Sequence, residues 1–212
     1  GAAVAAVDAV MTGETRRAFA AMRPPGHHAE PAVAMGFCFF NNVAVGALHA
    51  MRAHGIGRVA ILDFDVHHGN GTQAIFETDP AVVYGSIHEA PLFPGTGRDD
   101  EVGLGNIVNT CVRAGTDGPR WRAALEDRIL PAIDNFEPDF VMISAGFDAH
   151  AADPLANLRL DEDDFAWATA RMVEIAERHA DGRVVSVLEG GYDPDALVHS
   201  VIAHLRALEA SS

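Results

Sequence analysis

Apolar residues along the chain form two kinds of segment. Short continuous apolar runs predict strands, and longer segments with apolar residues at helical spacing predict helices. Strands are expected at 17–22, 58–63, 81–87, 140–145 and 184–188, and helices at 1–12, 41–54, 72–77, 120–136, 161–179 and 194–209. Because the strand runs are continuous rather than alternating, they are typical of a parallel sheet with both faces covered. The alternation of strand and helix predicts an α/β fold in a single domain over residues 1–212.

Composition and charge narrow the functional classes. The 212 residues are 49% hydrophobic, which is typical of a folded protein with a sizeable core. No apolar run approaches the roughly 20 residues of a membrane span, and the first residues lack the basic start of a signal peptide. We therefore expect a cytoplasmic protein of bacterial type with no membrane partner, and no pattern specifies its oligomeric state. The two cysteines, Cys38 and Cys111, form no metal-binding or disulfide motif.

The formal net charge of −15 argues against direct nucleic-acid binding, because phosphate recognition needs basic surface. The same charge is compatible with cationic substrates such as lysine-rich peptides or polyamines. Acidic composition is also common in soluble proteins, so the charge alone selects no substrate.

Polar side chains gather where the predicted strands end. Because parallel strands present their carboxyl ends at one edge of a sheet, we expect the segments that follow them to converge. These segments are RPPGHHAEP (23–31), DFDVHHGNG (63–71), GSIHE (85–89), SAGFDAH (144–150) and EGGYD (189–193).

Three residues in these segments have the spacing of metal ligands. Asp65 and His67 lie two positions apart, so on an extended chain both side chains point to the same face. Asp148 would add a third ligand, and two Asp with one His and an open position suit a catalytic Zn²⁺, or Fe²⁺ or Co²⁺. An Asp-x-His at a strand end is equally typical of a hydrogen-bonded rim, and the residues alone leave both interpretations open. Five histidines in predicted helices are expected to be surface or satisfied core residues: His49, His54, His179, His199 and His204.

Six segments together resemble the histone deacetylase family, taken broadly to include bacterial deacetylase-like amidohydrolases and acetylpolyamine amidohydrolases. They are RPPGHHA (23–29), GFCFFNNVAVGA (36–47), ILDFDVHHGNGTQAIF (61–76), SIHEAPLFPGTG (86–97), SAGFDAHAADPLANLRL (144–160) and LEGGYD (188–193). The resemblance implies the three-layer arginase/deacetylase fold, with a mainly parallel central sheet and helices on both faces. It also implies a zinc-dependent amidohydrolase that acts on linear amides.

The resemblance assigns catalytic roles by position. Asp65, His67 and Asp148 match the family's zinc ligands. His28 matches the general base, and Tyr192 matches the tyrosine that donates a hydrogen bond to the substrate carbonyl and to the oxyanion.

Further positions match the surroundings of these groups. His27 matches the charge-stabilising neighbour of the base, and Asp63 matches the carboxylate that bonds it. Asp63 would also help to hold a structural K⁺, with oxygen atoms of Asp65, His67, Ser86 and Ile87. Asn70 would pair with His28 where some relatives carry aspartate, which predicts a lower pKa for His28 than an aspartate partner would give. The neighbouring His68 is left as a structural residue.

The substrate tunnel would be lined by Gly36 and by two aromatic walls, Phe37 and Phe93. Leu155 stands where a polyamine-selective branch carries an acidic residue, so acetyl-lysine in a peptide or protein is the preferred substrate. Hydrolysis of an acetylpolyamine or another small acetyl-amine, and a metal-retaining binding module without catalysis, are the alternatives. An arginase-type site with two metals is disfavoured, because no second set of bridging carboxylates matches.

One departure from the family pattern concerns the N-terminal part. Only 22 residues precede RPPGHHA, whereas family members carry a longer segment with a sheet strand and a loop at the tunnel rim. We therefore expect one sheet edge and some rim contacts to be reduced.

Overall fold

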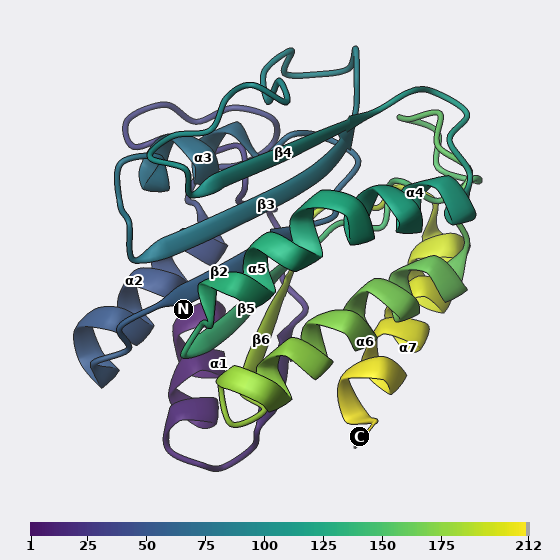
Figure 1. Cartoon of the computed structure of the whole chain (residues 1–212). Helices are drawn as coiled ribbons and strands as arrows, with labels where there is room; N and C mark the ends of the chain where they lie inside the picture. The colour runs from purple at the N-terminus through teal and green to yellow at the C-terminus, as the bar shows by residue number, and fades with distance from the viewer. Residues whose placement is uncertain (211–212) are drawn as a thin grey trace.

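The computed structural model describes residues 1–210 and contains one sheet of six parallel strands in the order β1-β6-β5-β2-β3-β4 (Figure 1). The strands are β1 (Arg17–Ala20), β2 (Val59–Asp63), β3 (Val82–Glu89), β4 (Ile107–Val112), β5 (Phe140–Ala145) and β6 (Val184–Leu188). The helices are α1 (Ala2–Met11), α2 (Asn42–His54), α3 (Asn70–Phe76), α4 (Gly118–Ala124), α5 (Leu130–Phe136), α6 (Glu162–His179) and α7 (Pro194–Glu209), with a π-helical turn η1 (Leu125–Ile129) that joins α4 to α5.

The sheet lies between two layers of helices. Successive residues of each strand point to opposite faces of the sheet, so each strand contributes to two separate cores. In β2, Val59 and Ile61 join a core with α1, α2 and Phe76 of α3. Ala60 and Leu62 join the second core, which contains residues of α4, η1, α5, α6 and α7. The predicted three-layer α/β fold with a parallel sheet is confirmed. None of the helices within residues 1–210 has both the length and the apolar character needed to cross a membrane.

The predicted elements differ from the structure mainly at β4, which the sequence pattern did not identify. This strand reads IVNTCV, and its apolar run is broken by Asn109 and Thr110. It lies at the edge of the sheet and pairs with β3 alone. An edge strand needs less apolar surface than a central one, so its pattern is weaker.

Local capping fixes α2 next to the loop that carries His27. The Asn41 side chain accepts a hydrogen bond from the Ala44 N–H at 3.0 Å and donates one to Thr72 Oγ1 at 3.1 Å. Such an N-cap satisfies a backbone donor that the helix itself cannot pair. The capped end of α2 therefore lies close to α3 and to the polar edge of the sheet.

His204 of α7 is a core residue, as one of the two interpretations for the helix histidines predicted. Its ring is fully buried and lies 2.6 Å from Thr169 Oγ1 and 2.9 Å from Ser186 Oγ. Burial lowers its pKa to about 3, so it stays neutral and hydrogen-bonded.

Candidate active site and metal centre

Asp63 is the last residue of the central strand β2, and the loops that follow the neighbouring strands meet beside it. It lies in register with Ser86 of β3 and Ser144 of β5. The segments after β1, β2, β5 and β6 contact one another at this edge, through hydrogen bonds between side chains and backbone groups of different loops. The structure thus brings the polar strand ends together.

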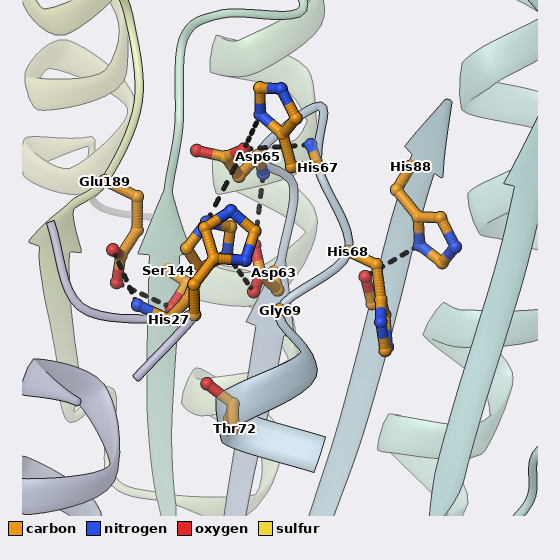
Figure 2. A network of polar contacts seen from close by, with 12 residues as sticks. His27, Asp63, Asp65, His67, His68, Gly69, Thr72, His88, Ser144 and Glu189 are labelled. Carbon is orange, nitrogen blue, oxygen red and sulfur yellow. Dashed lines mark hydrogen bonds and ion pairs between the residues drawn. The ribbon is translucent and has the colours of Figure 1, made fainter. Parts of the chain in front are cut away.

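Asp65, His67 and Asp148 form a tight cluster of possible metal ligands, and Figure 2 shows Asp65 and His67 next to each other. The Nδ1 atom of His67 lies 3.0 Å from Asp65 Oδ1 and 3.1 Å from Asp148 Oδ2. All three donor atoms lie within 4.8 Å of one another. Two glycines allow this approach, since a Cβ at Gly146 would collide with the Asp65 carboxylate and one at Gly190 with that of Asp148.

Backbone groups hold the two carboxylates in place. The Val66 N–H donates to Asp148 Oδ1 at 2.9 Å, and the Gly190 N–H donates to Asp65 Oδ2 at 2.8 Å. Each carboxylate therefore keeps its other oxygen turned toward His67. Metal sites typically have ligands that are oriented by hydrogen bonds of this kind from surrounding groups.

The two buried carboxylates concentrate negative charge at this point. Burial and the Asp65 charge raise the pKa of Asp148 to about 7. Burial disfavours the charged form of His67, but its contacts with Asp148 and Asp65 raise its pKa to about 10. Two carboxylate oxygens and one imidazole nitrogen suit a divalent ion such as Zn²⁺, Fe²⁺ or Co²⁺, whose charge would offset that of the carboxylates. The residues present therefore fit such an ion.

His27 lies beneath this cluster and is paired with Asp63. Its Nδ1 lies 3.0 Å from Asp63 Oδ2, which also accepts a hydrogen bond from the Tyr84 hydroxyl at 2.8 Å. Burial disfavours a charged ring, yet the charges of Asp63 and Asp65 raise the pKa of His27 well above its usual range. The site therefore favours the imidazolium form of His27.

His28 is held by Asn70, and the hydrogen bonds identify its protonated nitrogen. The Asn70 side chain donates its Nδ2–H to Glu30 Oε1 at 2.8 Å, because a carboxylate only accepts. Its Oδ1 therefore faces His28 Nδ1, at 2.9 Å, and accepts the Nδ1–H. Burial and the neighbouring His27 charge lower the pKa of His28 to about 3. His28 is thus neutral, with Nε2 as its basic nitrogen.

A cavity with a volume of ≈ 290 Å³ opens over these groups. The predicted tunnel residues all contribute to its walls, and the lining comprises Pro25, His27, His28, Gly36, Phe37, His67, Phe93, Leu155 and Tyr192. Gly36 has a φ of +55°, and a Cβ there would collide with the His28 ring. This glycine allows the loop that carries Phe37 to pass directly over the His28 ring.

Tyr192 reaches the cavity from the loop after β6. Its backbone N–H donates to Asp153 Oδ2 at 2.7 Å, and the Arg23 guanidinium lies 5.4 Å from the centroid of its ring. Burial raises the pKa of Tyr192 above its usual value, so its hydroxyl remains a donor at neutral pH. Neither Arg23 nor Asp153 was identified from the sequence.

Glu189 is a further residue that sequence reasoning did not assign, although it opens the EGGYD segment. Its buried carboxylate accepts hydrogen bonds from the backbone N–H groups of Gly26, at 2.6 Å, and His27, at 3.1 Å, and from Ser144 Oγ, at 3.1 Å. Burial raises its pKa to about 7. Glu189 thereby ties the histidine loop to the ends of β5 and β6 (Figure 2).

His68 lies apart from the metal-type donors and serves the loop that carries Phe93. Its Nδ1 lies 2.8 Å from Thr96 Oγ1 and its Nε2 lies 2.9 Å from Gln73 Oε1. The centroid of the His88 ring lies 4.8 Å from that of His68. His88 donates its Nε2–H to the Gly97 carbonyl oxygen of the same loop at 2.9 Å. Figure 2 shows both rings to one side of His27 and His67. The expectation that His68 is a structural residue agrees with these contacts.

The predicted monovalent-cation ligands lie beside Asp63. Ser86 is its register partner in β3, and Ile87 follows directly; both are fully buried. Ser86 Oγ also lies 2.9 Å from His88 Nδ1. The K⁺ site formed with Asp65 and His67 stays a prediction.

Comparisons with known proteins agree with this geometry. A family model described as the histone deacetylase domain matches residues 1–208. The chain is 43% identical to histone deacetylase 10, chloroplastic, of Oryza sativa subsp. japonica, over 98% of this chain and 49% of that protein. It is 46% identical to the histone deacetylase-like amidohydrolase of Pseudomonas aeruginosa, over 91% of this chain and 52% of that protein.

Two further comparisons extend the similarity. A probable deacetylase of Archaeoglobus fulgidus is 44% identical over 91% of this chain and 54% of its own length. The crystal structure of the HDA15 HD domain superposes with a TM-score of 0.90 at 38% identity, and covers 97% of this chain and 60% of that one. The chain thus spans about half the length of the relatives it matches.

Proposed function

Because this chain belongs to the histone deacetylase family, we propose that it hydrolyses N-acetyl amides, with acetyl-lysine in peptides or proteins as the preferred substrate. The observation that carries the proposal is the cluster of Asp65, His67 and Asp148 next to a cavity that His67 lines together with His28 and Tyr192. Amide hydrolysis needs an electrophile for the carbonyl, a base for water and a donor for the oxyanion. A metal ion held by the first three residues would be the electrophile, and His28 and Tyr192 offer the base and the donor.

The three clustered donors would hold a divalent metal ion, Zn²⁺ in the first place and Fe²⁺ or Co²⁺ as alternatives. When bound, such an ion polarises a carbonyl and lowers the pKa of a coordinated water toward about 7. A structural K⁺ would bind oxygen atoms of Asp63 and Ser86 nearby, together with those of Asp65, His67 and Ile87.

The chain's own residues supply the proton transfers. His28 Nε2 takes a proton from the attacking water, because Nδ1 already carries the proton that Asn70 accepts. The same nitrogen returns this proton to the leaving amine. His27, held as an imidazolium by Asp63, lies with its ring centroid 4.0 Å from that of His28 and favours the negative charge that develops on attack. Tyr192 donates its hydroxyl to the substrate oxygen.

The cavity wall supports acetyl-lysine as the substrate. The Phe37 and Phe93 rings offer apolar surface to the methylene stem of a lysine side chain. Leu155, 46% exposed, offers no carboxylate to the inner ammonium of a polyamine. The net charge of −15 adds a general attraction for basic peptides.

Metal analysis combined with hydrolysis of a fluorogenic acetyl-lysine peptide tests this function. We expect activity after loading with Zn²⁺, loss of the active-site metal and of activity in Asp148→Ala, and a loss of turnover with retained active-site metal in Tyr192→Phe. Faster turnover of an acetylpolyamine than of the peptide would indicate that small acetyl-amines, and not acetyl-lysine peptides, are the preferred substrates. A metal-loaded protein that hydrolyses no acetyl amide would refute the enzyme and indicate a binding module.

A further inference from the structure

A second group of metal-type donors lies outside the cavity, between α1 and α2. The Oδ1 atom of Asp8, on α1, lies 2.7 Å from His49 Nε2 and 2.7 Å from His54 Nε2, both on α2. The three donor atoms lie within 4.8 Å of one another, as do those of the catalytic cluster. The two imidazole rings are steeply inclined, at 82°, with centroids 5.4 Å apart. Hydrogen bonds from both histidines lower the pKa of Asp8.

Rigid packing positions these donors. α1 and α2 pack against each other on one face of the sheet (Figure 1). Val7, which precedes Asp8, is fully buried, and so is Ala50, which follows His49. His54 is the last residue of α2. The donors therefore project from two helices of the folded core and not from a loop.

The cluster differs from an ordinary histidine–carboxylate pair elsewhere in the chain. His179, the last residue of α6, makes one contact of 2.8 Å with Asp134, and that carboxylate is shared with the Arg178 guanidinium. At Asp8, by contrast, two imidazoles direct the same ring nitrogen at one oxygen. Within residues 1–210 neither ring hydrogen-bonds through Nδ1, so each Nδ1 can carry the proton when Nε2 serves as a ligand.

We propose that Asp8, His49 and His54 form a second site for a divalent transition metal, which joins α1 to α2. Two imidazole nitrogens and one carboxylate oxygen suit Zn²⁺, Co²⁺ or Ni²⁺, whereas Mg²⁺ and Ca²⁺ prefer oxygen ligands. Side-chain exposures of 47% for Asp8, 27% for His49 and 21% for His54 leave access for the ion and for water ligands.

The geometry needs only a small adjustment to take the ion. Tetrahedral coordination with bonds of about 2.1 Å separates neighbouring ligand atoms by about 3.4 Å. The two separations of 2.7 Å must therefore widen by about 0.7 Å, which rotation of partly exposed side chains allows. His54 lies at the end of α2 opposite the active site, about 20 Å along a helix of 13 residues. The site is therefore structural, and it does not rest on the proposed hydrolysis.

Metal stoichiometry tests the proposal directly. The protein is stripped with a chelator and titrated with Zn²⁺ alone, and bound zinc is measured after gel filtration. We expect two equivalents in the parent chain, one in Asp8→Asn and one in His54→Gln. His179→Gln, a matched change at another helix end, should retain two. Asp148→Ala should retain one, held at the second site.

Thermal unfolding gives an independent readout. At a Zn²⁺ concentration 100 times its Kd, a single site raises Tm by about 5–10 °C in a domain of this size. This increment should be lost in Asp8→Asn and His54→Gln and kept in His179→Gln. Equal zinc binding and equal increments in the parent chain and in Asp8→Asn would overturn the proposal and leave the cluster as a hydrogen-bonded triad.

Discussion

The partner of His28 offers the sharpest test of the catalytic assignment. Asn70 accepts the Nδ1–H of His28 but carries no charge, so it favours a charged ring through this hydrogen bond alone. Replacement by a carboxylate in Asn70→Asp keeps the acceptor and adds a negative charge about one hydrogen bond from the imidazole. This charge should raise the pKa of His28 from about 3.

The magnitude follows from the geometry. A charge about 4 Å from the ring, at an effective dielectric constant of about 20, interacts by about 4 kcal/mol, which corresponds to about 3 pH units. The full effect would move the pKa of His28 to about 6. The single variant Asn70→Asp should show a smaller rise in the pKa of His28, because its new carboxylate would face the negative charge of Glu30. The Oε1 atom of Glu30 lies 2.8 Å from the Asn70 amide nitrogen, which a carboxylate oxygen replaces in the variant. The double variant Asn70→Asp/Glu30→Gln removes that repulsion.

The assay is the pH dependence of kcat/KM on an acetyl-lysine peptide, which reports groups of the free enzyme. The double variant should gain an acidic limb near about pH 6, since a raised pKa means that the neutral base is lost at a higher pH. Glu30→Gln alone should leave the profile of the parent chain unchanged. An unchanged profile in the double variant, with full metal content, would refute the assignment of His28 as the base that Asn70 orients.

Three other outcomes follow from the site. Glu189→Ala should lower the free energy of unfolding by about 2–6 kcal/mol in urea melts, because two buried backbone N–H groups lose their acceptor, and Glu189→Gln should cost less. Gly97→Ala and Gly105→Ala should each lower the free energy of unfolding by about 1–2 kcal/mol, because both positions have a positive φ. Only Gly97→Ala should also raise KM, because its Cβ would collide with the His68 ring, whereas a Cβ at Gly105 would face open space. Leu155→Glu should shift the ratio of kcat/KM toward an acetylpolyamine by about tenfold, and no shift would remove this residue from substrate selection.

Local patterns in the sequence predicted most of the fold, because a parallel sheet buried on both faces requires uninterrupted apolar strands. Five of its six strands were identified in this way. β4 was missed because an edge strand with Asn109 and Thr110 carries no such run. The convergence of strand ends followed from topology alone, since parallel strands place their carboxyl ends at one edge.

Side-chain partners that lie far apart along the chain could not be predicted. Glu30 reaches Asn70, and Glu189 reaches the backbone of Gly26, through contacts that no local spacing encodes. The proximity of Asp8 to two histidines of α2 likewise depends on how two helices pack. Sequence patterns indicate residue types and faces, whereas such contacts appear only once the elements are assembled.

The position of β2 within the sheet determines how the site responds to partial opening. β2 lies between β5 and β3 and pairs with both along its whole length, from Val59 to Asp63. Its amide hydrogens should therefore exchange with solvent only when the sheet as a whole unfolds, while those of the edge strands β1 and β4 exchange through smaller fluctuations. Asp65 and His67 follow this protected strand directly. We therefore expect fraying at either edge of the sheet to leave their geometry intact.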